Sequence, residues 1–327
     1  MNNHLSQSAV CPICNGEVFP RFSVPCDYRK PQIPKDYEIY WCSRCDYGFV
    51  WERPKKEEIA DFYIMEDYYT HSAANDGNNH NKLSFLDRLR NNISWRLDAS
   101  ENLAPHEVQS LLQGEELTIC EIGCGNGNNL SKFLTEGFSV FGVEPDSSAR
   151  KVAQEQIINV FDGTAEELPK AISDRKYDVV LMSHVLEHCL DINAAVSNAK
   201  RILSKGGIYI VETPNCQSQG FKDYQGEWPW SDIPRHLNFF TPSSLEKILI
   251  KYGFDVKFTK YSGFCRQFSN SWLKEEEIIW LTFSKFISQK NSPPNFKARA
   301  WKLLLKSLFA SKAFKYDSVR LVGVNAN

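Results

Sequence analysis

The sequence lacks long apolar runs. Nowhere in its 327 residues do about 18 apolar residues follow one another, the length that a membrane-spanning helix needs. The N-terminus reads Met-Asn-Asn-His-Leu-Ser and lacks the basic and apolar stretches of a secretory signal peptide. An excess of one charge is also missing, since 38 basic and 40 acidic residues give a net charge of −2. These absences predict a cytoplasmic protein and give no global electrostatic case for a nucleic-acid partner.

Apolar residues make up 42% of the chain, and 327 residues are enough for one α/β domain and a smaller module. The stretch 117–127 reads Leu-Thr-Ile-Cys-Glu-Ile-Gly-Cys-Gly-Asn-Gly. It predicts a buried strand up to Glu121, a turn with three glycines, and a helix over 128–136. Alternate glycines let the backbone turn sharply and approach a ligand without a Cβ in the way. Taken alone, this pattern is as typical of a tight strand-to-helix connection without a ligand as it is of a ligand-binding turn.

Further segments end in polar residues, at the edge where ligands bind in open α/β sheets. A second strand over 139–144 ends in Glu144, whose carboxylate is suited to accept hydrogen bonds from ribose hydroxyls. A turn is predicted at 161–169. A fourth strand begins at 177 and leads into the polar residues before 189, and a helix and a strand follow within 191–213. The alternation of strands and helices favours a parallel α/β sheet.

The spacing E-x-G-x-G-x-G from Glu121 to Gly127 resembles motif I of class I S-adenosylmethionine-dependent methyltransferases, and the run 177–188 resembles their motif IV. The resemblance implies an α/β fold with a Rossmann-like seven-stranded methyltransferase sheet, and S-adenosyl-L-methionine as cofactor. The family usually has Asp where this chain has Thr164, so we expect a backbone N–H and a hydroxyl to contact adenine, with Asp162 a weaker candidate. The implied cofactor site consists of Glu121, Gly123, Cys124, Gly125, Gly127, Glu144, Thr164, Ala165 and Ser183.

Four of the ten cysteines form two C-x-x-C pairs, Cys11-Pro-Ile-Cys14 and Cys42-Ser-Arg-Cys45. Four thiolates in two such pairs can surround Zn²⁺ tetrahedrally, a pattern typical of a zinc ribbon. The alternative, two disulfides, is disfavoured by a cytoplasmic location. Four protein ligands leave no open position, so we expect a structural zinc ion that folds a small module. The other six cysteines are predicted to be unreactive thiols.

The chain divides into three predicted parts. Residues 1–70 form the zinc-ribbon module. Residues 71–115 form a linker and a helix, predicted over 82–112 with a break near Pro105, that leads into the next domain. Residues 116–327 form the methyltransferase domain.

Two segments of the methyltransferase domain are unusual. The loop 214–240 is too aromatic for disorder, and we expect it to cover the substrate. Thr241 predicts the N-cap of the helix that follows, with Pro242 at the first helical position. The last two strands, at 254–261 and 318–324, are expected to pair antiparallel.

A helical insertion is therefore predicted at 264–316, between these two strands. From 285 to 315 it carries eight Lys or Arg and no Asp or Glu. One explanation of this pattern is a helix that packs its apolar face on the core and exposes its basic face to solvent. The alternative is peripheral contact with an anionic membrane, or binding of a phosphorylated or lipid-linked acceptor.

Methyl transfer from an activated sulfonium mainly requires an aligned acceptor and a base. His184, Glu187 and His188 follow the fourth strand, and His236 lies in the aromatic loop. Because histidine titrates near neutral pH, we assign His188 as the base, with His236 second and Glu187 as a further catalytic residue. A helix-capping or structural role explains His188 nearly as well.

The acceptor is predicted from a second resemblance. The N-terminal Cys-Pro-x-Cys and the stretches 67–71 and 235–242 resemble a bacterial group of methyltransferases associated with surface-polysaccharide synthesis. This resemblance implies a small-molecule or glycan acceptor, with Arg235 and Tyr69 as candidates for binding it. The larger sugar C-methyltransferases have a further C-terminal domain for which this chain has no room, so O-methylation of a sugar hydroxyl is favoured.

Two rival functions are considered. Some ribosomal-RNA methyltransferases also place a zinc ribbon before this fold, but basic and acidic residues balance in the ribbon, a poor electrostatic match for RNA. A non-catalytic module that only binds the cofactor is disfavoured by the intact glycines and Glu144.

Overall fold

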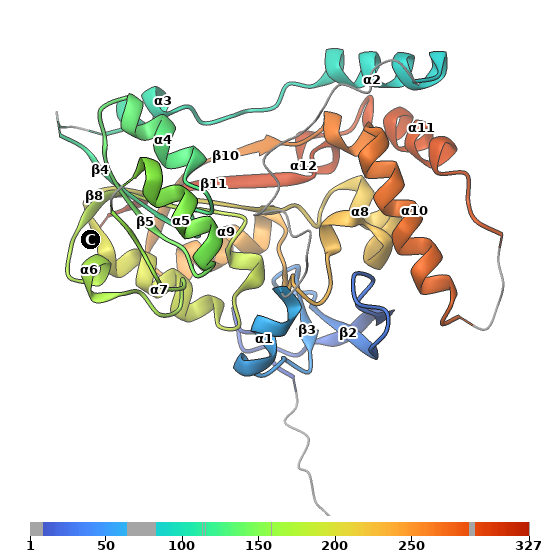
Figure 1. Cartoon of the computed structure of the whole chain (residues 1–327), viewed down its shortest axis with the longest axis horizontal. Helices are drawn as coiled ribbons and strands as arrows, with labels where there is room; N and C mark the ends of the chain where they lie inside the picture. Colours follow the sequence, from blue (N-terminus) through green and yellow to red (C-terminus); the bar gives the residue numbers. More distant parts are fainter. Residues whose placement is uncertain are drawn as a thin grey trace, which may run out of the picture.

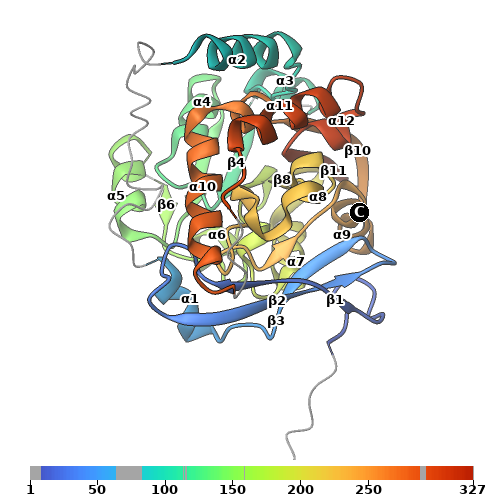
Figure 2. The same ribbon diagram turned by 90° about the vertical axis from the view of Figure 1, so that its right-hand side faces the viewer.

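The computed structural model describes residues 9–63, 83–112, 114, 116–157, 159–287 and 292–326. Figure 1 shows the N-terminal strands (blue) below the central sheet and the helices of the C-terminal third (orange and red) at its right-hand end. Seen from that end, in Figure 2, α10 (Asn270–Ser284) and α11 (Phe296–Ser307) stand between the viewer and the sheet, and α2 (Phe85–Leu97) lies across the top.

Seven strands form the central sheet in the order β10-β11-β8-β7-β4-β5-β6. β11 is antiparallel to both of its neighbours, and the strands from β8 to β6 are parallel to one another. The predicted Rossmann-like α/β fold with a seven-stranded sheet is therefore confirmed. The strands are β4 (Thr118–Ile122), β5 (Ser139–Val143), β6 (Val160–Phe161), β7 (Tyr177–Ser183), β8 (Leu203–Pro214), β10 (Phe254–Ser262) and β11 (Ser318–Asn325).

The parallel strands are apolar on both faces, as expected for strands covered by helices on each side. Ile119 and Cys120 on β4, and Val179 and Val180 on β7, are all fully buried. Alternate residues of these strands belong to two separate apolar cores, one on each face of the sheet. The carboxyl ends of the strands then meet at one edge, where α/β folds place their ligands.

The helices between the strands pack on these two cores. α4 and α5 contribute Leu130 and Ala153 to one core, and α7 and α9 contribute Val196 and Leu245 to the other. The predicted cap Thr241 is confirmed, since its hydroxyl accepts a hydrogen bond from the Ser244 N–H at 3.2 Å. The helices are α4 (Asn128–Thr135), α5 (Ser147–Gln156), α6 (Lys170–Ser173), α7 (Ile192–Ile202) and α9 (Pro242–Lys251).

The N-terminal part forms a second, antiparallel sheet that the aromatic loop completes. Its strands β1 (Phe19–Cys26), β2 (Pro34–Cys42) and β3 (Tyr47–Trp51) are followed by α1 (Lys56–Tyr63). The fourth strand, β9 (Asn238–Phe239), comes from the loop and pairs with β3. The ribbon and the methyltransferase domain therefore share a β-sheet.

The aromatic loop is more structured than the sequence predicts. It contains α8 (Gln219–Tyr224) and two 3-10 helices, 225–227 and 229–231. Phe221 and Trp228 are buried, and Phe221 stacks on Trp41 of β2 with ring centroids 6.0 Å apart. Both rings fill the core beneath the ribbon, and the expectation that the loop covers the substrate stays a prediction.

The predicted helix over 82–112 is also corrected. α2 (Phe85–Leu97) ends before Pro105, and α3 (Pro105–Ser110) is a separate short helix. Asp98 ends α2 because its backbone is extended and its carboxylate accepts hydrogen bonds from the N–H and the hydroxyl of Ser100. Such local side-chain bonds compete with helix continuation.

The predicted helical insertion is present. It contains a 3-10 helix at 265–268, α10 (Asn270–Ser284), α11 (Phe296–Ser307) and α12 (Lys312–Lys315). α11 buries Leu303 and Leu304 against the neighbouring helices. Within the described residues no helix is long and apolar enough to cross a bilayer.

Half of the eight basic residues between 285 and 315 are paired with carboxylates of this chain. Four of them form ion pairs with carboxylates outside the insertion, which supports the packed-helix interpretation and leaves less charge for an anionic membrane. The pairs are Lys297–Asp87, Arg299–Glu227, Lys306–Asp223 and Lys312–Glu101.

Candidate functional site

The glycine-rich turn after β4 is shaped by positive backbone angles. Gly123, Gly125 and Gly127 have φ values of 72°, 53° and 81°, which L side chains rarely adopt. A Cβ on Gly123 would collide with Val185, whereas a Cβ on Gly125 would meet no described atom within 4 Å. The turn therefore packs against the segment after β7 and leaves open space beside Gly125, where a ligand can approach the backbone.

Glu144 is bound to this turn. One oxygen of its buried carboxylate accepts a hydrogen bond from the Gly125 N–H at 2.7 Å, and the other accepts one from the Asp146 N–H at 2.8 Å. Burial raises the pKa of Glu144, and these two backbone hydrogen bonds oppose that rise. The lone pairs that remain can accept from hydroxyls beside Gly125, as the ribose assignment requires.

Glu121 has a buried carboxylate that is only half satisfied. Its Oε1 accepts a hydrogen bond from Asn129 at 3.0 Å, and its Oε2 is buried with no partner among the described residues. Burial raises the pKa of Glu121 to about 8, opposed by the Asn129 hydrogen bond and reinforced by the charge of Glu144. A free acceptor in this position suits a cationic ligand group, and S-adenosylmethionine carries an ammonium and a sulfonium. The residues therefore fit the cofactor.

The other predicted cofactor residues have partners within the protein. The Thr164 hydroxyl accepts from the Glu167 N–H at 3.0 Å, and the Ser183 hydroxyl donates to Glu212 at 3.3 Å. Ala165 and Cys124 are buried in the two cores of the sheet. The more weakly favoured Asp162 forms an ion pair with Arg150. Their contacts with the cofactor stay predictions.

The two histidines assigned to catalysis are adjacent. His188 ends the 3-10 helix Leu186–His188, and its ring centroid lies 4.6 Å from that of His236. Nδ1 of His188 is 3.0 Å from the Arg235 carbonyl, and Nδ1 of His236 is 2.7 Å from the Trp230 carbonyl. A carbonyl only accepts hydrogen bonds, so the Trp230 carbonyl assigns the proton of the neutral His236 ring to Nδ1. Nδ1 of His188 also lies 2.9 Å from the Tyr63 hydroxyl, whose oxygen can accept from the same N–H as the Arg235 carbonyl, so the proton of the neutral ring is assigned to Nδ1 there too. Each Nε2 then carries a lone pair.

Glu187 completes a cluster with these histidines. Its side chain is fully buried, Oε1 accepts a hydrogen bond from His184 Nδ1 at 3.1 Å, and Oε2 has no partner among the described residues. Burial acts to raise the pKa of Glu187, but the interactions with His184 outweigh it and lower the pKa. A nitrogen of His188, a nitrogen of His236 and an oxygen of Glu187 all lie within 4.8 Å of one another.

Asn238 holds the two halves of this cluster together, and sequence reasoning missed it. Its Nδ2 donates to the carbonyls of Leu186, Glu187 and Cys189 at 3.1, 3.3 and 2.7 Å. Its Oδ1 accepts from the hydroxyl of Tyr47, on β3, at 2.5 Å. The only available signal was the resemblance of the stretch 235–242, which does not assign roles to individual residues.

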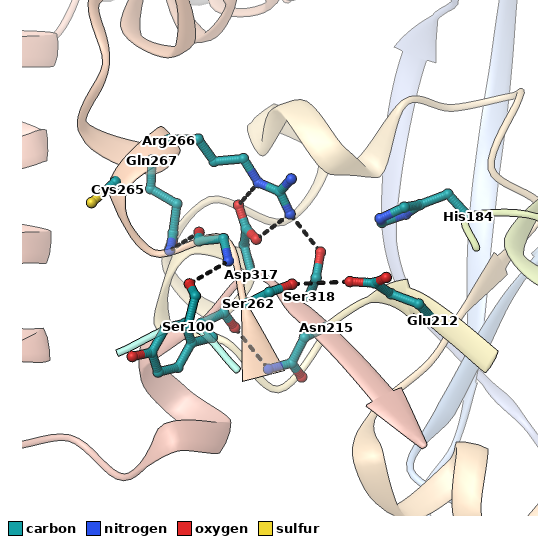
Figure 3. A network of polar contacts seen from close by, with 12 residues as sticks. Ser100, His184, Glu212, Asn215, Ser262, Cys265, Arg266, Gln267, Asp317 and Ser318 are labelled. Atoms are coloured by element: carbon teal, nitrogen blue, oxygen red, sulfur yellow. Dashed lines mark hydrogen bonds and ion pairs between the residues drawn. The ribbon is translucent and has the colours of Figure 1, made fainter. Parts of the chain in front are cut away.

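The side of the site next to β8 is a polar network (Figure 3). Glu212 near the carboxyl end of β8 accepts a hydrogen bond from Ser262 at 2.9 Å and pairs with Arg320 at 2.5 Å. Burial acts to raise its pKa, but the positive charges of His184 and Arg320 outweigh this and lower the pKa to about 2. The Glu212 carboxylate is therefore ionised, and both of its oxygens have partners within the protein.

The insertion contributes Arg266 to this side. Figure 3 shows its guanidinium directed at Asp317, which it binds at 2.6 Å. The same guanidinium lies over the ring of Trp230, 4.7 Å from its centroid. Trp230 also stacks on His184, with centroids 4.8 Å apart and ring planes at 12°. Flat rings next to His188 and His236 are suited to the face of a ring-shaped acceptor.

Of the two residues assigned to acceptor binding, Arg235 is corrected. Its side chain is fully buried, and its guanidinium binds Asp27 at 2.8 Å and Asp232 at 2.8 Å. It therefore joins the ribbon to the loop and has no donor directed at the site. Tyr69 lies outside the described residues.

The four cysteines of the two C-x-x-C pairs come together as predicted. Their sulfur atoms lie within 4.8 Å of one another, and those of Cys14 and Cys42 are 3.7 Å apart. Asn15 and Asp46, directly after each pair, both have positive φ, so the two turns have matching geometry. All ten cysteines lie in the described part of the chain, and the structure has none of them in a disulfide.

The order of the central sheet and the glycine-rich turn after its first strand define a class I methyltransferase domain. Residues 93–257, about half of the chain, match the family described as "Methyltransferase domain". The chain therefore belongs to this family, and its domain is an S-adenosylmethionine-dependent methyltransferase domain.

Relatives of known type share this part of the chain. The ubiquinone biosynthesis O-methyltransferase of Azorhizobium caulinodans is 31% identical over 163 residues, which are 46% of this chain and 64% of that enzyme. The enzyme of the same name from Rhodopseudomonas palustris is 26% identical over 180 residues, 52% of this chain and 70% of that enzyme. The chain spans about two thirds of the length of these relatives.

Solved methyltransferase structures resemble the chain at low identity. A Thermotoga maritima S-adenosylmethionine-dependent methyltransferase is 21% identical with a TM-score of 0.45, over 73% of this chain and 91% of that one. One from Archaeoglobus fulgidus is 19% identical with a TM-score of 0.46, over 72% and 94%.

Proposed function

We propose that this protein transfers the methyl group of S-adenosylmethionine to a hydroxyl oxygen of a small-molecule acceptor. The observation that carries the proposal is the contact between the glycine-rich turn after β4 and the segment after β7. The glycine-rich turn, with Glu144 and the open space at Gly125, packs against Val185, three residues before His188. In this proposal, a cofactor beside Gly125 and a base after β7 lie at the same edge of the sheet.

In this proposal the glycine-rich turn and two carboxylates hold the cofactor, which supplies an activated methyl group. Glu144 accepts from the ribose hydroxyls, and the unpaired oxygen of Glu121 faces the cationic part. Gly123, Gly125 and Gly127 let the ligand approach the backbone, with Cys124, Thr164, Ala165 and Ser183 as the further contacts that the family resemblance implies.

His188 acts as the general base. As the acceptor oxygen forms its bond to the methyl carbon and the carbon–sulfur bond breaks, the hydroxyl proton passes to Nε2 of His188. The Arg235 carbonyl holds the proton on Nδ1, which keeps Nε2 in the accepting state. His236 is the second candidate, and the buried carboxylate of Glu187 stabilises positive charge on the histidines.

The acceptor is a hydroxylated ring, and we propose two classes in order. A sugar hydroxyl follows from the resemblance to polysaccharide-associated methyltransferases. A phenolic hydroxyl is the second candidate, because the matched relatives are named ubiquinone biosynthesis O-methyltransferases. The stacked rings of His184 and Trp230 suit the flat face of either.

We further propose that Cys11, Cys14, Cys42 and Cys45 bind one structural Zn²⁺ ion. Four thiolate sulfurs within 4.8 Å of one another fit a tetrahedral site with no open position. The ion would hold β2 and β3 in place, and β3 pairs with β9, which carries Asn238.

The test is methyl transfer from labelled S-adenosylmethionine to a fractionated extract of the host. Label in nucleotide-sugar or lipid-linked saccharide fractions supports the sugar acceptor, and label in phenolic lipids supports the second class. Label in RNA, or in no fraction, contradicts the proposal.

With the identified acceptor, His188→Gln should lower kcat about 100-fold or more and leave cofactor affinity unchanged. The exposed His106→Gln is the matched control.

A further inference from the structure

We propose that Glu187, His188 and His236 together bind one divalent transition-metal ion next to the acceptor. Within the described residues this is one of two groups whose ligand atoms converge closely enough for a metal, the other being the four cysteines. The two groups differ in chemistry, since one offers four sulfurs and the other offers two imidazoles and a carboxylate.

The distances are compatible with a shared ion after small side-chain rotations. Ligand atoms bound to one ion at about 2.1 Å lie roughly 3 to 3.5 Å from one another. The three atoms here lie within 4.8 Å of one another. A closure of about an ångström needs only changes in side-chain torsions, and the backbone can stay where it is.

The hydrogen bonds of the two histidines match those of metal ligands. Metal-binding histidines usually donate their other ring N–H to a carbonyl or a carboxylate, which fixes the tautomer and the ring direction. His188 and His236 both do so through backbone carbonyls, at 3.0 and 2.7 Å. The carbonyls therefore leave both Nε2 lone pairs for the cluster.

The buried oxygen of Glu187 is an independent observation that points to a ligand. A carboxylate oxygen shielded from water without a hydrogen-bond donor costs free energy unless another group satisfies it. Oε2 of Glu187 has no such donor among the described residues, although its side chain has no solvent exposure. Oε1 is held by His184 at 3.1 Å, so the carboxylate is oriented before an ion arrives.

The backbone around the three ligands is also fixed. Glu187 and His188 belong to one 3-10 helix, and His236 lies two residues before β9. Asn238 bonds the carbonyls of the helix, and the Leu237 N–H donates to the Glu187 carbonyl at 2.7 Å. The ligands therefore come from two segments that are tied to each other, as a site for a tightly held ion requires.

Two imidazoles and one carboxylate favour ions such as Mn²⁺, Fe²⁺ or Zn²⁺ over Mg²⁺ and Ca²⁺, which prefer oxygen ligands alone. Three protein ligands leave at least one position open. If the proposed methyl transfer is correct, the acceptor hydroxyl would bind there, its pKa would fall, and its proton would pass to solvent. The ion would then replace His188 as the group that generates the nucleophile.

Mn²⁺ binding to the purified protein tests this inference without acceptor or cofactor. The paramagnetic resonance signal of free Mn²⁺ measures binding, and four thiolates are poor ligands for this ion. We expect one Mn²⁺ per chain, with affinity lowered at least about tenfold in Glu187→Gln and in His236→Gln. The His106→Gln variant should bind as the wild type does.

Cofactor affinity and the far-ultraviolet circular dichroism of each variant show whether it is folded. Absence of Mn²⁺ binding, or binding unchanged in a folded His236→Gln protein, would overturn the inference. Methyl transfer that survives chelation, with no Mn²⁺ bound, would reject the ion and leave the histidine base standing. Mn²⁺ bound as expected, without transfer to any fraction, would support the ion and reject the proposed function.

Discussion

Backbone groups orient most of the functional side chains of this site. Glu144 accepts from two backbone N–H groups, and His188 and His236 contact backbone carbonyls through Nδ1. The strands and turns fix these backbone positions, so the side chains are oriented before a ligand binds. The two unpaired oxygens, on Glu121 and Glu187, are the exceptions, since neither has a hydrogen-bond partner among the described residues.

Glu121 should make cofactor binding depend on pH. Burial raises its pKa to about 8, so at pH 7 the carboxyl group of the free protein is mainly protonated. A cationic ligand favours the ionised form, so affinity for S-adenosylmethionine should increase as the pH rises from about 6 toward 8 and then level off. Binding at pH 7 should release a proton, which calorimetry in buffers of different ionisation enthalpy measures.

The Glu121→Gln variant is the control for this prediction. Glutamine keeps the size of the side chain and removes its titration, so proton release and the pH dependence should both disappear. Release that persists in this variant would assign the proton to another group and remove Glu121 from the cofactor site.

Among the elements, the glycine-rich turn offers a matched pair of substitutions. Gly125 and Gly137 both have positive φ, and a Cβ on either would meet no described atom within 4 Å. Alanine at either position should therefore cost a similar 1–2 kcal/mol in backbone strain. Only the methyl group at 125 would enter the proposed cofactor space, so Gly125→Ala should weaken S-adenosylmethionine binding about tenfold or more.

Titration calorimetry and thermal unfolding of the two variants separate these effects. We expect equal losses of Tm and unequal losses of affinity. An equal loss of affinity would mean that the cofactor does not pass close to Gly125 and would remove this residue from the proposed cofactor site.

The elements also show what could be predicted from the sequence. The strands around Glu121, Glu144 and Ser183 were predictable because each is a short apolar run followed by a polar turn, a pattern contained in a few neighbouring residues. The two C-x-x-C pairs were equally local. The end of α2 at Leu97 was missed because it depends on the side chain of Asp98, which bonds the next turn instead of continuing the helix.

The parts that could not be predicted depend on contacts between distant segments. β9 has only two residues and exists because β3, almost 200 positions earlier in the chain, pairs with it. Asn238 and Trp230 gain their roles from that placement. Arg235 was assigned to the acceptor because its partners, Asp27 and Asp232, were not recognisable as neighbours from the sequence.

In the whole molecule, the ribbon is connected to the cluster of Glu187, His188 and His236 through a continuous set of contacts. The second cysteine pair lies where β2 turns into β3, β3 pairs with β9, and Asn238 on β9 holds the 3-10 helix that carries Glu187 and His188. Arg53, just after β3, adds hydrogen bonds to the Leu237 carbonyl and to Asn238 Oδ1. The ribbon is therefore a structural support of the site as well as the carrier of the four-cysteine group.

Loss of the metal from the four cysteines should consequently reduce methyl transfer as well as stability. In Cys14→Ser we expect about one zinc ion fewer per chain, a Tm lower by at least ~5 °C, and a kcat that falls more than the cofactor affinity does. The reason is that the cofactor turn belongs to the central sheet, whereas the histidine cluster depends on β3 and β9. Cys265→Ser, which changes a cysteine outside the cluster, is the control. Zinc analysis, thermal unfolding and the labelled-methyl assay measure the three quantities, and a Cys14→Ser protein with reduced zinc but unchanged kcat would show that the site does not need the ribbon.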